Sequence, residues 1–183
     1  MDAVKKISTS LPDVFILEPR VFGDERGFFL ESYNEKVLAA LGIDHHFVQD
    51  NHSRSTRNVL RGLHYQIQHP QAKLVRVVEG EILDVAVDMR SSSATFGKSV
   101  AVTLSGENHR MLWIPIGFAH GFRVVSPVAH VLYKASDYYA PEHERTLLWS
   151  DPELKIDWKL ESAPIVSAKD QRGTKLRDAD SFK

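Results

Sequence analysis

Apolar and polar residues alternate along much of the chain, and a period of two is typical of short β-strands. The alternation is clearest at residues 81–89, where Asp84 and Asp88 would share one face of the strand and apolar side chains would form the other. Clusters of Gly, Pro, Ser and Asn separate this strand from its neighbours. Further strands are expected at residues 59–66, 73–78, 97–104, 110–114, 119–125 and 130–138.

The N-terminal part of the chain combines shorter strands with one clear helical pattern. Residues 14–17 and 27–33 are expected to form strands on either side of a turn at 23–27. Residues 35–42 follow Asn34, which is a good N-cap, and carry an apolar stripe at helical spacing. This segment is therefore predicted to be a helix.

A strand is expected at residues 47–51, and a polar loop is expected to follow it at 53–58. One helix cannot cover a parallel sheet, whereas many short strands with regular turns favour an all-β sandwich or barrel. The sequence therefore predicts an all-β fold with one or a few short helices.

Composition narrows the possible functions. The chain has 183 residues, enough for one domain, and 43% of them are hydrophobic, enough for an ordinary core. A net charge of −1 argues against nucleic acid or a membrane surface as a general partner. The chain has no cysteine, so disulfides and thiolate metal sites are excluded. Without a signal pattern or an apolar run long enough to span a bilayer, a cytoplasmic location is expected.

The strand at residues 59–66 carries the first candidate chemistry. Alternation puts Gly62, His64 and Gln66 on one face, so an imidazole would lie beside the space that a glycine leaves. Histidine exchanges protons near neutral pH, and this arrangement suits catalysis by proton transfer. The alternative is a core histidine whose hydrogen bonds are satisfied.

A second motif, Pro-x-Gly-x-x-His, ends at His120. This spacing resembles the second motif of the cupins, small jelly-roll barrels with a ligand cavity. Metal-binding cupins carry a His-x-His pair on one strand, and here the second position is Gln66, a poor ligand for transition metals. A metal-free cavity is therefore favoured over a metal site.

Without a metal, other residues must stabilise charge in the cavity. Lys73, Arg61 and Tyr133 are candidates, although Tyr133 could equally be a core tyrosine with its hydroxyl satisfied. Asp170 lies near the C-terminus and by itself would be interpreted as a solvated charge.

Over residues 13–170 the chain resembles the dTDP-4-keto-6-deoxyglucose 3,5-epimerases. The motifs that carry the resemblance occur in the family's order. They are PRVFGDERGFF at 19–29, FVQDNHS at 47–53, NVLRGLH at 58–64, KLVR at 73–76, WIPIGFAHGF at 113–122, LYK at 132–134 and SAKD at 167–170.

The resemblance implies a cupin-type jelly roll that forms one domain over residues 1–183, with residues 162–183 packed partly over the cavity. It also implies the catalytic roles. His64 would be the base that removes the C3 and C5 protons, and Asp170 would hydrogen-bond its ring. Tyr133 would donate a proton from the opposite face, and Lys73 would stabilise the enolate oxygen. No metal or other cofactor is implied.

The resemblance further implies dTDP-4-keto-6-deoxyglucose as the small-molecule partner. Arg61 and Lys169 would suit its diphosphate, and Phe22, Tyr138 and Tyr139 could stack on the thymine. The other positions that match the family's nucleotide-sugar contacts are Arg26, Glu31, Gln49, Asp50, Asn51, Lys73, His120 and Glu144.

Two structural expectations accompany this set. Arg61 and His64 are three positions apart, so a regular strand would point them to opposite faces. Either Gly62 carries a bulge that brings both to one cavity, or Arg61 reaches another part of the ligand. The family is homodimeric with N-terminal strands that cross between subunits, and the apolar edge strand at 14–17 is compatible with that.

Three alternatives remain open from the sequence. The first is a relative that inverts only C3 or C5, or a ketoisomerase of a dTDP-deoxysugar pathway. The second is a metal-dependent cupin oxygenase, against which Gln66 argues. The third is a sugar-binding module without catalytic activity, which would leave the matched acid and base without a role.

Overall fold

The structure is a computed structural model that describes residues 3–183. β-Strands make up most of the ordered elements, and the all-β prediction is confirmed. The strands are β1 (Val4–Ser8), β2 (Phe15–Pro19), β3 (Val21–Asp24), β4 (Gly27–Leu30), β5 (Gln49–Thr56), β6 (Val59–Gln66), β7 (Lys73–Glu79), β8 (Glu81–Asp88), β9 (Ser99–Ser105), β10 (Met111–Ile114), β11 (Phe118–Val124), β12 (Val128–Ala135), β13 (Glu144–Thr146) and β14 (Ile165–Val166).

Helices are few and short. α1 (Glu35–Ala40) begins as predicted at Asn34, whose side chain accepts hydrogen bonds from two backbone N–H groups of the first turn. The others are α2 (Ala168–Gln171) and two short 3₁₀ segments, η1 (Pro141–His143) and η2 (Leu176–Asp178). No helix within residues 3–183 is both long and apolar enough to cross a membrane.

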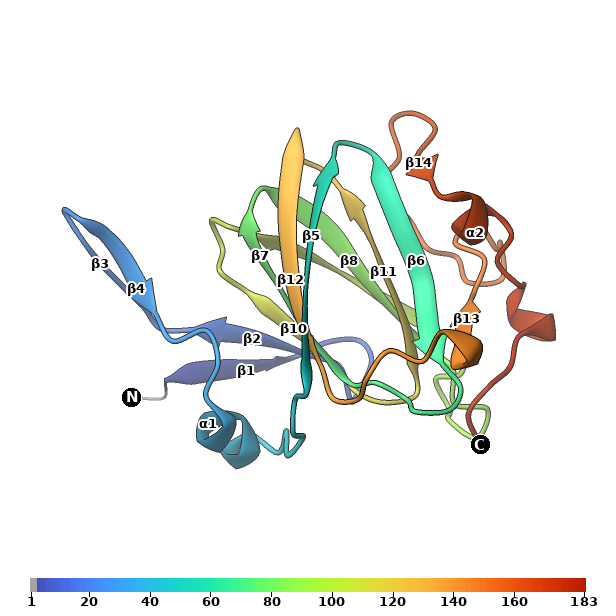
Figure 1. Cartoon of the computed structure of the whole chain (residues 1–183), viewed down its shortest axis with the longest axis horizontal. Helices are drawn as coiled ribbons and strands as arrows, with labels where there is room; N and C mark the ends of the chain where they lie inside the picture. Colours follow the sequence, from blue (N-terminus) through green and yellow to red (C-terminus); the bar gives the residue numbers. More distant parts are fainter. Residues whose placement is uncertain (1–2) are drawn as a thin grey trace.

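Two antiparallel sheets form the body of the molecule. The first has the strand order β1-β2-β10-β7-β12-β5 and the second the order β13-β6-β11-β8-β9, with β14 added beside β6. A separate hairpin of β3 and β4 projects away from both sheets, and the C-terminal segment lies along β6 (Figure 1).

The main hydrophobic core fills the space between the two sheets. Val75 and Val131 enter it from the first sheet, and Ala86 and Phe122 enter it from the second. Asp84 follows the same alternation, so its carboxylate points inward from β8 and is fully buried. The face of β8 that was predicted to be apolar packs on the other side of the second sheet.

The outer face of each sheet has its own cover. Leu38 and the residues around α1 pack on the first sheet. The C-terminal segment covers the second, where the Trp158 indole is buried and donates a 2.9 Å hydrogen bond to the Trp149 carbonyl. Farther along, the Tyr65 hydroxyl donates to the Asp180 carbonyl and Phe182 packs on the Tyr65 ring. This cover carries residues 165–170 to the edge of β6.

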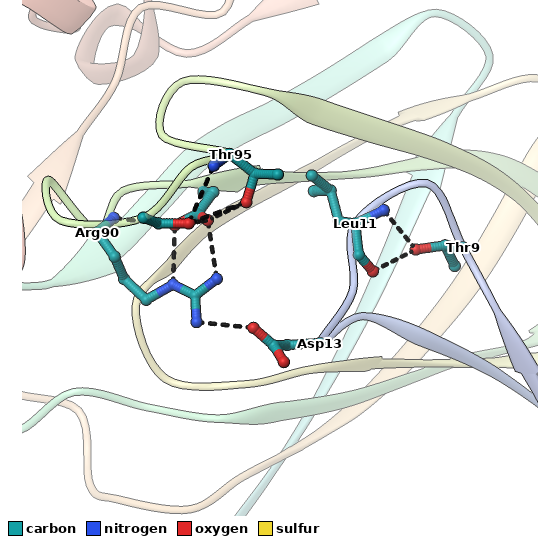
Figure 2. A network of polar contacts seen from close by, with 7 residues as sticks. Thr9, Leu11, Asp13, Arg90 and Thr95 are labelled. Atoms are coloured by element: carbon teal, nitrogen blue, oxygen red, sulfur yellow. Dashed lines mark hydrogen bonds and ion pairs between the residues drawn. The ribbon is translucent and has the colours of Figure 1, made fainter.

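A polar network closes one end of the sheets (Figure 2). Arg90 donates hydrogen bonds to Asp88 at 2.9 and 2.8 Å and a further one to Asp13 at 2.8 Å. Burial would raise the pKa of Asp88, but hydrogen bonds from Arg90, Thr95 and Ser93 outweigh burial and lower this pKa to about 2. The network ties the loop before β2 to the turn between β8 and β9.

The prediction of a polar loop at 53–58 was wrong. β5 continues to Thr56 and pairs with β12 along its whole length, and the turn falls at Arg57 and Asn58. The cause is that β5 is an edge strand with an exposed outer face and an inner face that borders a polar cavity, so neither face needs apolar residues. The strand expected at 130–138 also ends earlier, at Ala135.

Candidate active site

A cavity of about 580 Å³ lies between the sheets and is closed on one side by the C-terminal segment. β6, β7, β11 and β12 contribute side chains, as does the turn of α2. Seven of the residues predicted from the sequence line it: Arg61, His64, Lys73, His120, Tyr133, Lys169 and Asp170.

His64 and Asp170 form the central pair of the cavity. The imidazole Nε2 lies 2.6 Å from Asp170 Oδ1, and the Gly62 backbone N–H donates to Asp170 Oδ2 at 3.3 Å. Ser167 Oγ caps α2 by accepting from the Asp170 backbone N–H, which fixes the backbone that carries the carboxylate. Burial would raise the pKa of Asp170, but the hydrogen bonds from His64 and Gly62 outweigh burial and lower it. The carboxylate is therefore ionised and accepts the Nε2 proton.

A bulge in β6 explains how Arg61 and His64 reach the same cavity. His120 pairs with His64 in the β6–β11 ladder, whereas Phe122 pairs with Arg61, so two steps on β11 match three on β6. Of the two alternatives left open by the sequence, the structure therefore has the bulge around Gly62. Arg61 is held in place by a 3.1 Å hydrogen bond from its Nε to Ser55 Oγ on β5.

Two glycines allow β6 and β11 to come this close. Gly62 has a φ of 106°, and a Cβ atom there would lie 2.6 Å from the His120 carbonyl oxygen. A Cβ at Gly121 would lie 2.5 Å from the Arg61 carbonyl oxygen. A larger residue at either position would push His64 and His120 apart.

Tyr133 and Lys73 face the cavity from the first sheet, whereas His64 and Asp170 approach from the opposite side. Burial raises the pKa of Tyr133, so the phenol keeps its proton. Burial lowers the pKa of Lys73 to about 8, and the negative charges of Asp84 and Glu144 partly offset this effect. Lys73 is therefore still mostly an ammonium at neutral pH.

His120 has a buried acidic partner that the sequence analysis did not assign. Its Nε2 lies 2.7 Å from Asp84 Oδ1, and within residues 3–183 no hydrogen-bond partner reaches Asp84 Oδ2. Alternation placed Asp84 on the polar face of β8, which by itself indicates exposure to solvent, so the pattern did not point to a buried partner for His120. A carboxylate on the inward face of a strand is costly to bury without a partner.

Glu144 links the cavity to the exposed loop that follows β12. Its Oε1 lies 2.8 Å from Lys169 Nζ, and its Oε2 accepts a 2.8 Å hydrogen bond from the Tyr139 hydroxyl. Burial would raise the pKa of Glu144, but the bonds from Lys169 and Tyr139 outweigh burial and lower it. Tyr138 and Tyr139 are 65% and 54% exposed, so their rings are open to a ligand.

The other predicted binding residues do not line this cavity. The side chain of Gln49 bonds to Asn51 and to the backbone of Tyr139. Asp50 pairs with Lys134 at 2.9 Å and, with Asn51, borders a separate cavity of about 150 Å³.

Phe22 and Arg26 belong to the projecting β3–β4 hairpin, and Glu31 follows that hairpin directly (Figure 1). Arg26 there forms an ion pair with Asp24 at 2.5 Å. The 580 Å³ cavity of the same chain receives none of these three side chains.

No group of three or more histidine, aspartate or glutamate side chains in the described part of the chain is arranged to hold a metal ion. Gln66 lies at the position of the second histidine of metal-binding cupins, and its amide forms hydrogen bonds with backbone groups. Its Nε2 donates to the His69 and Tyr138 carbonyls, and its Oε1 accepts from the Ala140 N–H.

Comparison with known families identifies the fold and the motifs. The profile of a protein family described as dTDP-4-dehydrorhamnose 3,5-epimerase matches residues 8–178. The chain belongs to this family. A family member from Pseudomonas aeruginosa, a dTDP-4-dehydrorhamnose 3,5-epimerase, is 58% identical over 180 residues, which cover 98% of this chain and 99% of the relative.

Solved structures of the 3,5-epimerase family have the same architecture. A dTDP-6-deoxy-D-glucose-3,5-epimerase from Legionella pneumophila, in complex with dTDP-4-keto-L-rhamnose, has a TM-score of 0.95 at 52% identity and covers 97% of this chain and 95% of its own. A 3′-monoepimerase from Streptomyces bikiniensis, in complex with dTDP-quinovose, has a TM-score of 0.87 at 31% identity, with 94% and 88% coverage. These structures confirm the cupin-type fold and the family that the sequence motifs predicted.

Proposed function

We propose that this protein inverts C3 and C5 of dTDP-4-keto-6-deoxy-D-glucose and so forms dTDP-4-keto-L-rhamnose, a step of dTDP-L-rhamnose biosynthesis. The observation that carries the proposal is the His64–Asp170 pair, which faces Tyr133 across one cavity. A base and an acid on opposite sides of a sugar ring are what inversion by proton transfer requires.

The proposed base is His64. An ionised Asp170 accepts the proton on Nε2 and fixes the tautomer, so Nδ1 becomes the basic nitrogen. The C4 carbonyl of the substrate acidifies the protons on both neighbouring carbons. Removal of the C5 or the C3 proton breaks a C–H bond, and its electron pair moves into an enolate with negative charge on the C4 oxygen.

Lys73 is proposed to stabilise that enolate. A protonated amine in a buried site is a strong electrostatic partner for a developing oxyanion, because little water screens the charge. The pKa of about 8 keeps most of the amine protonated near neutral pH. His120, fixed by Asp84, is proposed to contact the sugar beside it.

Tyr133 is proposed as the acid. It belongs to the sheet opposite His64, and its raised pKa favours the neutral phenol. Transfer of its proton to the enolate carbon from the face opposite His64 gives the inverted centre. The tyrosinate and the histidinium then exchange protons with solvent before the next inversion.

Nucleotide binding is proposed for the cationic edge of the cavity. Arg61 and Lys169 both line it, and a guanidinium can bind two diphosphate oxygens at once. Glu144 orients both Lys169 and Tyr139. This arrangement supports a role in binding the thymine nucleobase for Tyr139 and its neighbour Tyr138.

We also propose a homodimer in which the β3–β4 hairpin reaches the cavity of the second copy. Val21, Phe22, Phe28 and Phe29 of this hairpin are all exposed, which is costly for a monomer. Phe22 and Arg26 match the family's ligand contacts but are absent from their own chain's cavity. Exchange of hairpins would account for both observations. A cytoplasmic location remains part of the proposal.

Solvent exchange tests the proposed reaction. In D₂O with the dTDP-keto-sugar, the wild-type protein should place deuterium at both C3 and C5, as read by NMR. His64→Asn should abolish exchange at both carbons. It should still bind dTDP, because other residues, Arg61 and Lys169, are proposed to bind the diphosphate. The exposed His46 offers a control, His46→Asn, that should exchange normally. Double epimerisation retained by His64→Asn would refute the assignment of the base.

A single-site epimerase is the second candidate, because a 3′-monoepimerase has the same fold with a TM-score of 0.87. The two reactions differ in the number of deuterium atoms in each product molecule. Two atoms with L-rhamno stereochemistry support the 3,5-epimerase, and one atom supports the single-site enzyme. Tyr133→Phe should still exchange protons but fail to invert normally.

A further inference from the structure

Three glutamines hold the backbone of residues 137–140, the segment that presents Tyr138 and Tyr139. The Gln66 amide donates to the Tyr138 carbonyl at 3.2 Å and accepts from the Ala140 N–H at 2.8 Å. The Gln71 amide donates to the Asp137 carbonyl at 2.8 Å, and the Gln49 carbonyl oxygen accepts from the Tyr139 N–H at 3.0 Å. They come from three separate places: the first residue of β5, the last residue of β6 and the loop after β6.

The segment has no regular secondary structure of its own. Irregular backbone must find hydrogen-bond partners elsewhere, and here the glutamine side chains supply them. Gln66 is only 4% exposed and uses both amide hydrogens and its carbonyl oxygen in these bonds and in a further one to the His69 carbonyl. Its position on β6, two residues after His64, fixes the loop relative to the proposed base.

The two tyrosine rings have a different environment from their backbone. The backbone is held by buried or half-buried amides, whereas both rings are more than half exposed. Tyr139 is further oriented by its hydroxyl bond to Glu144, which pairs with Lys169 at the cavity. A fixed backbone with open aromatic faces is a preformed surface for a flat ring, because little conformational freedom is lost when a ligand binds.

We propose that Gln66, supported by Gln49 and Gln71, is a positioning residue that holds residues 137–140 ready for the nucleobase. This inference rests on the proposed function and adds to it a reason for glutamine at position 66. At the place where related metal barrels carry a histidine, this chain uses the side chain to fix the part of the protein that selects the nucleotide.

The test replaces Gln66 with methionine, which has a similar shape and cannot make these bonds. Gln66→Met should raise the KM for the dTDP-keto-sugar and the Kd of dTDP about tenfold, roughly the effect of losing one net hydrogen bond. The kcat and its pH profile should stay unchanged, because His64, Asp170 and Tyr133 are not touched. Gln68→Met, at an exposed glutamine of the neighbouring loop, is the matched control and should leave both constants unchanged.

A double-mutant cycle separates positioning of the ring surface from general loosening of the fold. With Tyr138 and Tyr139 both replaced by alanine, the further change Gln66→Met should no longer weaken dTDP binding. Inorganic pyrophosphate, which has no base, should inhibit the wild type and Gln66→Met equally. Equal loss of dTDP affinity in both backgrounds, or a fall in kcat with unchanged KM, would overturn the inference.

Two further measurements keep the test decisive. If Gln66→Met does not fold, as judged by its thermal unfolding, Gln71→Met removes a single half-buried bond to the same segment and should weaken dTDP binding in the same direction. Binding of dTDP is measured by calorimetry and needs no turnover. A protein without epimerase activity that still shows the dTDP effect would refute the proposed reaction and leave the role of Gln66 standing.

Discussion

His64 and Asp170 are 106 positions apart in the chain, and their side chains meet at 2.6 Å. The parallel pairing of β14 with β6 makes this contact possible, because Ile165 and Val166 lie beside Val59 and Leu60. The chain then turns through α2 and returns the carboxylate to the ring of His64. The C-terminal segment is therefore part of the catalytic apparatus that we propose.

Asp170→Asn should preserve the packing of residue 170 against His64 but no longer accept the proton on Nε2. An amide can donate a hydrogen bond to Nε2 and so favour the tautomer in which Nδ1 carries the proton. We expect kcat to fall by about 100-fold or more, in the range of general base catalysis, with little change in the Kd of dTDP. Asp178→Asn, at an exposed acid of the same segment, is the control. Equal activity of the two variants would remove Asp170 from the mechanism.

Lys73 should make both activity and stability depend on pH. Its pKa is lowered by burial to about 8 in the folded protein, from the ordinary lysine value of 10.5. The proposed mechanism needs the ammonium, so kcat should fall as pH rises through about 8. A rate that stays constant up to pH 10 would contradict this role.

The same lowered pKa has the opposite effect on stability. Between pH 8 and 10.5 the unfolded chain binds the Lys73 proton and the folded chain does not, so this residue makes stability rise with pH in that range. Below pH 8 Lys73 is protonated in both states. Burial of its charge then lowers the free energy of unfolding by the full amount, up to about 3 kcal/mol. Lys73→Met should therefore unfold at higher urea concentration than wild type at pH 7, and the difference should shrink at pH 10.

The sequence could predict those strands that have one apolar and one polar face. β8 shows the clearest alternation, although both of its faces are buried: the main core lies on the side of Asp84, and a second core packs on its apolar face. β5 could not be predicted in full because neither of its faces meets the core. The contact between His64 and Asp170 depends on long-range pairing, which alternation does not contain, and only the family motifs pointed to it. The Asp84–His120 pair was missed because alternation marks Asp84 only as part of a polar face, and its inward position is seen in the structure alone.

Gly121→Ala should disturb the site through the backbone. The added methyl group would meet the Arg61 carbonyl oxygen at 2.5 Å and Gly62 Cα at 3.2 Å, and neither can move without shifting β6. We expect a loss of about 1–3 kcal/mol in the free energy of unfolding, as for other overpacked positions, together with a lower kcat. Gly23→Ala, whose new Cβ would make only an ordinary 3.7 Å contact, is the stability control. Unchanged stability and activity in Gly121→Ala would show that the close approach is not required.

Complementation between two inactive variants should reveal whether the hairpin acts in the partner's cavity. A chain with His64→Asn has a normal hairpin, and a chain with Arg26→Ala has a normal base. If hairpins exchange, a mixed dimer contains one cavity with both residues intact and one with neither. Refolding the two variants together at equal concentration should restore roughly a quarter of the wild-type sites, because half of the dimers are mixed.

The alternative geometry gives a different result from the same mixture. If Arg26 acts in the cavity of its own chain, every site lacks either the base or the arginine, and mixing restores nothing. Light scattering of the mixture establishes that dimers have formed, so that a negative result is informative. Mixing either variant with itself is the control for residual activity. Recovery in the mixture alone would assign Arg26 to the second copy, and recovery is expected because the β3–β4 hairpin extends away from its own cavity (Figure 1).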